Sequence, residues 1–162
     1  MYTVQINTPF DHTRINLAIL PAIRKNAKAM LSPFPFVGCK GIHTLAKKIA
    51  NLNQSKLPET KQVLFLAHIV RMQEEIGTGG AGFRYLYAAF LQESAQRLNL
   101  PTLAKAAETL TEIGDRWRTF ASQAVKYCRH PQSEKMLTLA TELHQIANDE
   151  CQLWHDLSQL SD

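Results

Sequence analysis

More than half of the glycines of this chain lie in one short segment. Four of its seven glycines lie within six residues, at Gly77, Gly79, Gly80 and Gly82, in a sequence of 162 residues. A glycine inside a helix costs roughly 0.5–1 kcal/mol relative to alanine, because the unfolded backbone at glycine is unusually free. A chain that otherwise omits glycine is suited to long helices, and the cluster marks one connection that needs a special backbone.

Apolar residues recur at steps of three and four along most of the chain, as they do in amphipathic helices. We expect helices over about residues 13–31, 41–52, 58–76, 83–98, 102–127 and 132–160, with no strand of useful length. Pro21 lies inside the first of these and predicts a kink or a fresh helix start near Leu20. The sequence therefore predicts an all-α fold, a single bundle of about six helices in one domain spanning residues 1–162.

Composition excludes several classes of protein. No apolar run approaches the roughly 20 residues that cross a bilayer, so we expect no membrane partner. The three cysteines include no CxxC pair, which disfavours a disulfide framework. The N-terminal segment lacks the basic and apolar pattern of a signal peptide. These features favour a cytoplasmic protein.

Charge is distributed unevenly along the chain. Residues 1–57 hold eight Lys and Arg against the single acid Asp11, whereas residues 58–162 hold ten Lys and Arg against thirteen acids. This asymmetry predicts an acidic partner for the first third. The alternative is that the basic segment pairs with the acidic remainder of the same fold. A nucleic acid is the less favoured partner, because residues 1–57 show no recognisable helix-turn-helix.

The glycine cluster is the first candidate binding site. Its last glycines precede a helix start, where free N–H groups and the helix dipole favour an anion. We therefore expect a phosphate or carboxylate site formed by Thr78, Gly79, Gly80, Gly82, Phe83 and Arg84. The Walker and GxGxxG patterns are both absent. The alternative is a tight turn between helices in which Arg84 pairs with Glu74 or Glu75.

Cysteine and histidine residues supply two further candidates. Cys39 and His43 are four residues apart, as a nucleophile and its base on one helix face would be. His144, Cys151 and His155 share one stripe of the last helix and are a weak candidate for a transition-metal site. The alternatives are a structural turn at Cys39 and an ordinary buried face in the last helix. We expect no cofactor, and the catalytic residues stay unassigned.

Three segments resemble one known family. They are Gly77–Ala95, the pair Ala29–Pro33 and Gly38–Ile42, and Ile113–Trp117. Together they span roughly residues 15–130 and resemble the C-terminal helical domain of unknown function in proteins similar to the butirosin-biosynthesis acyltransferase BtrH. In that family a papain-like or C39-peptidase-like domain precedes the helical one and is thought to hold the catalytic cysteine. The protein that names the family transfers an acyl group from an acyl carrier protein to an aminoglycoside.

The resemblance implies an accessory or binding module in natural-product biosynthesis. Only about fourteen residues precede the resembling region, so we expect a split subunit, a shortened relative or a detached domain, and catalysis of the family's kind is not assigned to this chain alone. The module would position an acyl or carrier substrate, or dock the separate catalytic subunit. An acidic acyl carrier protein would suit the basic first third. Two alternatives stay open, a free-standing enzyme with a Cys/His or metal centre and a nucleic-acid binder. A homo-oligomer is a further partner state that the sequence leaves open.

Overall fold

The computed structural model describes residues 11–52, 54–76, 79–131 and 133–161, with the side chains of residues 133 and 134 left aside. This part of the chain contains six α-helices and one 3₁₀-helix, and no strand. The elements are α1 (His12–Met30), α2 (Gly38–Leu52), α3 (Glu59–Glu74), η1 (Ala81–Phe83), α4 (Arg84–Leu98), α5 (Pro101–Arg129) and α6 (Ser133–Ser158). The predicted all-α bundle of about six helices is confirmed.

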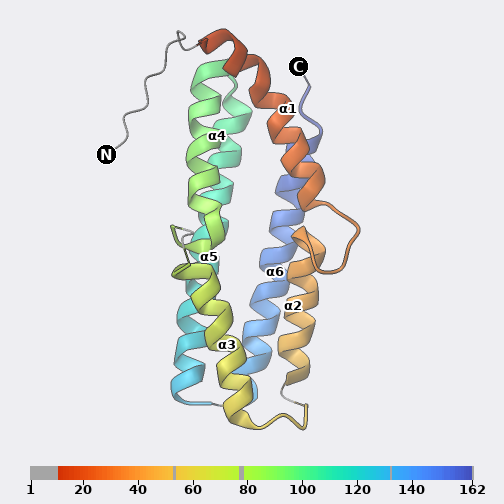
Figure 1. Ribbon diagram of the computed structural model, residues 1–162, viewed down its shortest axis with the longest axis vertical. Helices are drawn as coiled ribbons and strands as arrows, with labels where there is room; N and C mark the ends of the chain where they lie inside the picture. The colour runs from red at the N-terminus through yellow and green to blue at the C-terminus, as the bar shows by residue number, and fades with distance from the viewer. Residues whose placement is uncertain (1–10, 53, 77–78, 132, 162) are drawn as a thin grey trace, which may run out of the picture.

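Two long helices, α5 and α6, run antiparallel through the length of the molecule (Figure 1). Helices α3 and α4 both pack on α5, whereas α1 and α2 both pack on α6. A helix of 29 residues is about 43 Å long, long enough for α3 and α4 to lie on α5 one above the other. The bundle therefore has four columns, two continuous and two broken.

The two broken columns are interrupted at the same height (Figure 1). The connection from α1 to α2 covers residues 31–37, and the connection from α3 to α4 contains the glycine cluster. Residues beside both breaks, Met30 and Gly82, line one cavity inside the bundle. Each break thus opens the core at a level where two helices end and the next two begin.

Helix α1 corrects one expectation. Pro21 lies inside a single helix that runs from His12 to Met30, so no fresh start occurs at Leu20. The helix begins with a side-chain cap, because Oδ1 of Asp11 accepts from the backbone N–H groups of Thr13 and Arg14 at 3.0 and 3.2 Å. Buried Ile19 and Ile23 flank Pro21 and hold the helix on the bundle.

A glycine in the middle of α5 allows α4 to approach closely. A Cβ atom on Gly114 would lie 2.8 Å from Cε1 of Tyr85, closer than packed carbon atoms come. The hydroxyl of Tyr85 donates to Oδ1 of Asp115 at 2.7 Å. Burial, together with this bond, raises the pKa of Tyr85 to about 12. Gly114 therefore fixes the start of α4 against the centre of α5.

Candidate functional site

A buried ion pair lies at the level of the two breaks. Nε of Arg84, the first residue of α4, is 2.5 Å from Oε1 of Glu150 on α6. The Glu150 side chain is 1% exposed and the Arg84 side chain 15%. The same Oε1 accepts from Nε1 of Trp117 on α5 at 2.6 Å, and the Arg84 guanidinium lies over the Trp117 ring. This pair ties α4, α5 and α6 together.

The glycine segment holds the Arg84 guanidinium. Four consecutive residues from Gly79 to Gly82 have positive φ, as does Phe83. This left-handed path turns the carbonyls of Ala81 and Gly82 toward Nη1 of Arg84, at 2.9 and 3.3 Å. Positive φ at Ala81 and Phe83 costs on the order of 1–3 kcal/mol each and is characteristic of functional sites. The segment therefore presents carbonyl oxygens to a cation.

A carboxylate from α3 occupies the other side of the glycine segment. Oε1 of Glu74 accepts from the backbone N–H of Ala81 at 3.2 Å and from Nε2 of Gln73 at 2.9 Å. The same Gln73 nitrogen donates to the carbonyl of Trp117 at 2.9 Å. Glu74 thereby anchors the start of η1 to α3 and α5.

These contacts bear on the expected anion site. Arg84 pairs with neither of its predicted partners, Glu74 and Glu75, but with Glu150, a residue 66 positions away. Of the expected site residues, Gly82 contacts Arg84 through its carbonyl, Gly79, Gly80 and Phe83 belong to the same left-handed segment, and Thr78 lies outside the described residues. Since Arg84 already faces a buried carboxylate, an anion bound at this segment would compete with Glu150. The anion site stays a prediction.

A cavity of about 260 Å³ opens between α1 and α4. We call it the α1–α4 cavity; its walls include Ala29, Met30, Phe83, Tyr87, Glu150 and Trp154. The exposed residues that line it are Asn26, Ala29 and Phe83, so its entrance is mainly apolar with one amide side chain. Tyr87 packs against Trp154 with ring centroids 5.1 Å apart, and its hydroxyl accepts from Nδ2 of Asn26 on α1 at 3.4 Å. Apolar walls with a few polar groups are typical of small-molecule sites.

Two buried polar atoms in the walls of this cavity lack hydrogen-bond partners among the described residues. They are Oε2 of Glu150 and Nε1 of Trp154. The residues are four apart on α6 and hence on one face of the helix. Leaving such an atom unpaired costs about 1–3 kcal/mol, and more for a charged group. Glu150 and Trp154, both of which line the cavity, therefore each carry an unsatisfied polar group in this part of the core.

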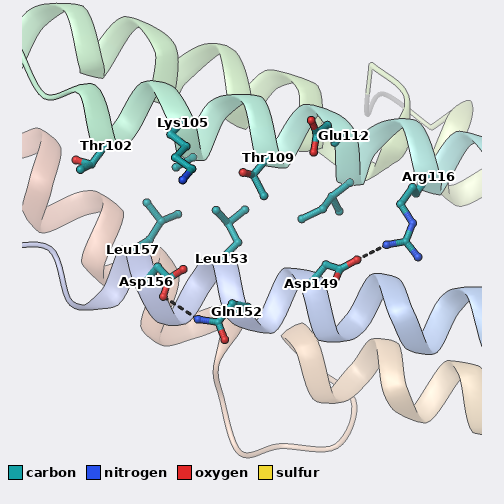
Figure 2. A pocket seen from close by; sticks show the side chains of 12 residues that line it. Thr102, Lys105, Thr109, Glu112, Arg116, Asp149, Gln152, Leu153, Asp156 and Leu157 are labelled. Atoms are coloured by element: carbon teal, nitrogen blue, oxygen red, sulfur yellow. Dashed lines mark hydrogen bonds and ion pairs between the residues drawn. The ribbon is translucent and has the colours of Figure 1, made fainter.

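A larger surface groove of about 450 Å³ lies between α5 and α6 (Figure 2). Arg116 from α5 reaches across it to Asp149 on α6, and Gln152 donates to Asp156 along α6 (Figure 2). Arg116 also contacts Glu142 at 3.0 Å. None of the unpartnered buried atoms of the described residues belongs to the walls of this groove. The α1–α4 cavity is therefore the stronger candidate.

The two residues of the predicted cysteine–histidine pair contact different partners on α6: Cys39 lies beside Cys151, and His43 lies beside His144. Cys39 is 2% exposed, and burial together with the neighbouring Cys151 thiol raises its pKa. His43 does not face Cys39 as a base, because its Nδ1 lies 3.1 Å from Nδ1 of His144 on α6. Burial and the nearby His144 lower the pKa of His43. A thiol held in its neutral form is a poor nucleophile.

The three residues of the weak metal candidate, His144, Cys151 and His155, also contact different neighbours. His144 contacts His43, Cys151 contacts Cys39, and His155 is exposed beside Asp156. Over the described ranges, no three His, Cys, Asp or Glu side chains gather as a group that would hold a metal ion. These helix stripes pair α2 with α6, in keeping with the structural alternative.

Most lysines of the first third make no ion pair within the described part of the fold. Five exposed lysines on α1, α2 and the following turn form no ion pair with any described residue; they are Lys25, Lys28, Lys40, Lys47 and Lys56. The acids of the later segments pair instead with arginines of those segments. The alternative in which the basic third neutralises the acidic remainder is thus not realised by these lysines.

Sequence reasoning missed Glu150 as a site residue. Its one available signal was a charged residue within the apolar stripe of the last helix, beside Leu153 and Trp154. Such a residue is rarely buried unless it is paired. Its partner belongs to a helix start elsewhere in the chain, which no local pattern identifies.

Comparison with known proteins gives one match. A family model described as a domain of unknown function (DUF4872) matches residues 1–157. No curated protein and no solved structure matches the chain. No helix of the described residues is long and apolar enough to cross a membrane.

Proposed function

The chain belongs to this DUF4872 family, and we propose that it acts as a helical binding module whose α1–α4 cavity receives the acyl part of a substrate. The observation that carries the proposal is a mainly apolar cavity lined by Glu150 and Trp154, two residues that each hold a buried polar atom without a partner. The resemblance to the helical domain of BtrH-like acyltransferases supports an acyl substrate. On this proposal the module positions a substrate, and the chemistry belongs to a separate catalytic subunit.

The size of the cavity limits what it holds. A volume of about 260 Å³ is slightly below the roughly 300–1,000 Å³ of drug-sized sites. It suits an acyl chain with one polar group better than a whole aminoglycoside. The apolar residues at the entrance, Ala29 and Phe83, favour the hydrocarbon part of such a group.

Lysines adjacent to the cavity support a carrier-bound substrate. Lys25 and Lys28 are exposed on α1, next in sequence to the cavity residues Asn26 and Ala29. Exposed, unpaired lysines attract an acidic surface and steer its approach. An acidic acyl carrier protein that docks on α1 would present its acyl group at the entrance.

Titration with butyryl-pantetheine tests the cavity. The only two tryptophans, Trp117 and Trp154, both contact the site, so intrinsic fluorescence reports binding. Ala29→Phe narrows the entrance and is expected to weaken binding about tenfold or more. The matched control is Ala22→Phe, an exposed alanine of the same helix that is not part of the cavity. Absence of binding to the unmodified protein, or equal binding by both variants, would contradict the proposal.

Charge reversal tests the docking surface. Lys25→Glu with Lys28→Glu is expected to weaken binding of an acidic carrier protein and to reduce the dependence of binding on salt. The control reverses two exposed lysines outside the first third, Lys61 and Lys126. A nucleic-acid binder, one of the two alternatives, predicts salt-dependent DNA or RNA binding that the first variant abolishes. Equal carrier binding by both double variants would reject docking on α1.

A further inference from the structure

The groove between α5 and α6, which we call the α5–α6 groove, plays no part in the proposed function. Its volume of about 450 Å³ lies within the roughly 300–1,000 Å³ of small-molecule sites. Apolar side chains from both helices line it, and Leu153 and Leu157 point from α6 toward α5 (Figure 2). Together with Ala106 and Ile113 of α5 they form what we call the apolar floor.

Two oppositely charged side chains of α5 line the groove without an ion pair. Lys105 and Glu112 are exposed, and neither pairs with any described residue. They are two helical turns apart, so their Cα atoms lie about 10 Å apart along one side of α5. Thr109 lies between them and, like Lys105, points toward α6 (Figure 2). One wall of the groove thus carries a cation and a carboxylate that a ligand could pair.

The other charged residues of the groove have partners. Arg116 contacts Asp149 across the groove, and Asp156 accepts a hydrogen bond from Gln152 at 2.8 Å (Figure 2). Because Asp156 adds a negative charge that no cation balances, a ligand with negative charge alone is disfavoured. A ligand with positive charge alone would leave Lys105 without a counterion. The groove therefore favours a ligand that carries both charges.

We propose that the α5–α6 groove binds a short apolar peptide with free ends, its carboxylate at Lys105, its ammonium group at Glu112 and its side chains on the apolar floor. The two ends of a peptide carry opposite charges that its backbone holds apart. Two or three extended residues span about 7–10 Å, close to the separation of Lys105 and Glu112 along α5. This inference goes beyond the proposed function, since the groove shares no lining residue with the α1–α4 cavity.

Four forms of one dipeptide test the two charged ends. They are Leu-Leu, its N-acetyl form, its C-terminal amide and the form with both caps, each titrated calorimetrically at pH 7 and low salt. Leu-Leu is expected to bind most tightly, and each cap should weaken binding about three- to fivefold, as expected for an exposed ion pair. Gly-Gly keeps both charges but no apolar side chain and should bind at least about tenfold more weakly than Leu-Leu. Equal binding by the four forms, or no binding of Leu-Leu, would overturn the proposal.

Two variants test which residue receives which end. Lys105→Gln should abolish the preference for a free carboxylate and keep the preference for a free ammonium group, and Glu112→Gln should do the reverse. The matched control is Glu108→Gln, an exposed acid of the same helix that does not line the groove, and it should keep both preferences. Circular dichroism checks that each variant is folded. Retention of both preferences in Lys105→Gln and Glu112→Gln would contradict the assignment.

Titration with butyryl-pantetheine separates this inference from the proposed function. Lys105→Gln and Glu112→Gln should leave its binding unchanged, because neither residue lines the α1–α4 cavity. If Leu-Leu and butyryl-pantetheine compete for one site, the peptide occupies the α1–α4 cavity and the groove assignment fails. If butyryl-pantetheine binds and Leu-Leu does not, the binding module stands and only the peptide site is rejected.

Discussion

Nε of Arg84 and Oε1 of Glu150 lie 2.5 Å apart and join the start of α4 to the middle of α6. The pair is placed where both broken columns of the bundle are interrupted, and Trp117 completes it from α5. It forms part of the wall of the α1–α4 cavity. Its integrity therefore determines both the stability of this level of the bundle and the shape of the candidate site.

Removing one member of the pair is expected to be strongly destabilising. Glu150→Gln leaves Arg84 buried without its anion and should lower the free energy of unfolding by about 3–5 kcal/mol, measured by urea denaturation. The double variant Arg84→Met with Glu150→Leu should lose less than the sum of the single variants, because no buried charge is left alone. The control Glu93→Gln breaks an exposed pair with Arg97 and should cost about 0.5 kcal/mol. Additive single effects would contradict the coupling.

Gly82 is expected to tolerate no side chain. A Cβ at this position would lie 2.7 Å from Nη1 of Arg84, and φ is +57°. Gly82→Ala should therefore lower stability by about 2–3 kcal/mol, through backbone strain and displacement of Arg84. The matched control is Gly79→Ala, which has φ of +68° but a nearest neighbour at 3.7 Å, and it should cost about 1 kcal/mol. Equal losses would show that the contact with Arg84 does not matter.

The His43–His144 contact predicts a loss of stability in mild acid. Burial and His144 lower the pKa of His43 below its ordinary 6.5. The unfolded chain therefore takes up a proton near pH 6.5 that the folded chain takes up only at lower pH. The neutral His43 therefore stabilises the folded protein fully above about pH 6.5. This contribution is lost as the pH falls through the pKa of His43 in the unfolded chain and then through its lower pKa in the folded protein.

The measurement is the melting temperature between about pH 7 and pH 5. His43→Gln should melt with a weaker dependence on pH than the unmodified protein. His155→Gln, which changes an exposed histidine outside this contact, is the control. If the melting temperature of His43→Gln depended more steeply on pH than that of the unmodified protein, the predicted effect of the His43–His144 contact would be contradicted.

Cys39 is expected to resist alkylation in the folded protein. Its side chain is buried and its pKa is raised, so little thiolate is present and little of it is accessible. Under native conditions iodoacetamide should modify the half-buried Cys128 and Cys151 before Cys39, as measured by mass spectrometry of peptides. Unfolding in urea should remove the difference. Selective native labelling of Cys39 would instead support the cysteine-based enzyme.

Much of the fold follows from local patterns. Helical periodicity and proline positions predicted all six helices to within a few residues, because an amphipathic stripe must be buried somewhere. Of the two alternatives predicted at Pro21, a kink or a fresh start, the fresh start was wrong, since one helix that buries Ile19 and Ile23 continues through the proline. Propensity at a single residue yields to the burial of its neighbours.

The candidate site was predictable only in part. The glycine segment and Arg84 were identified from sequence, because glycine is rare elsewhere and arginine is unusual at a helix start. The sequence did not predict which backbone groups of the glycine segment face Arg84. The structure shows that they are carbonyl oxygens. Left-handed conformations at successive residues are not encoded by glycine alone, since Ala81 and Phe83 adopt them too.

The sequence by itself determined that this chain is helical and that one connection in it is special. Helix formation depends on residues three and four apart, so it can be predicted from the order of residues along the chain. Only the tertiary structure decided that Arg84 meets Glu150, that His43 meets His144, and that Trp154 lines a cavity. These contacts join helices far apart in sequence, and they arise from which faces the four columns bury against one another.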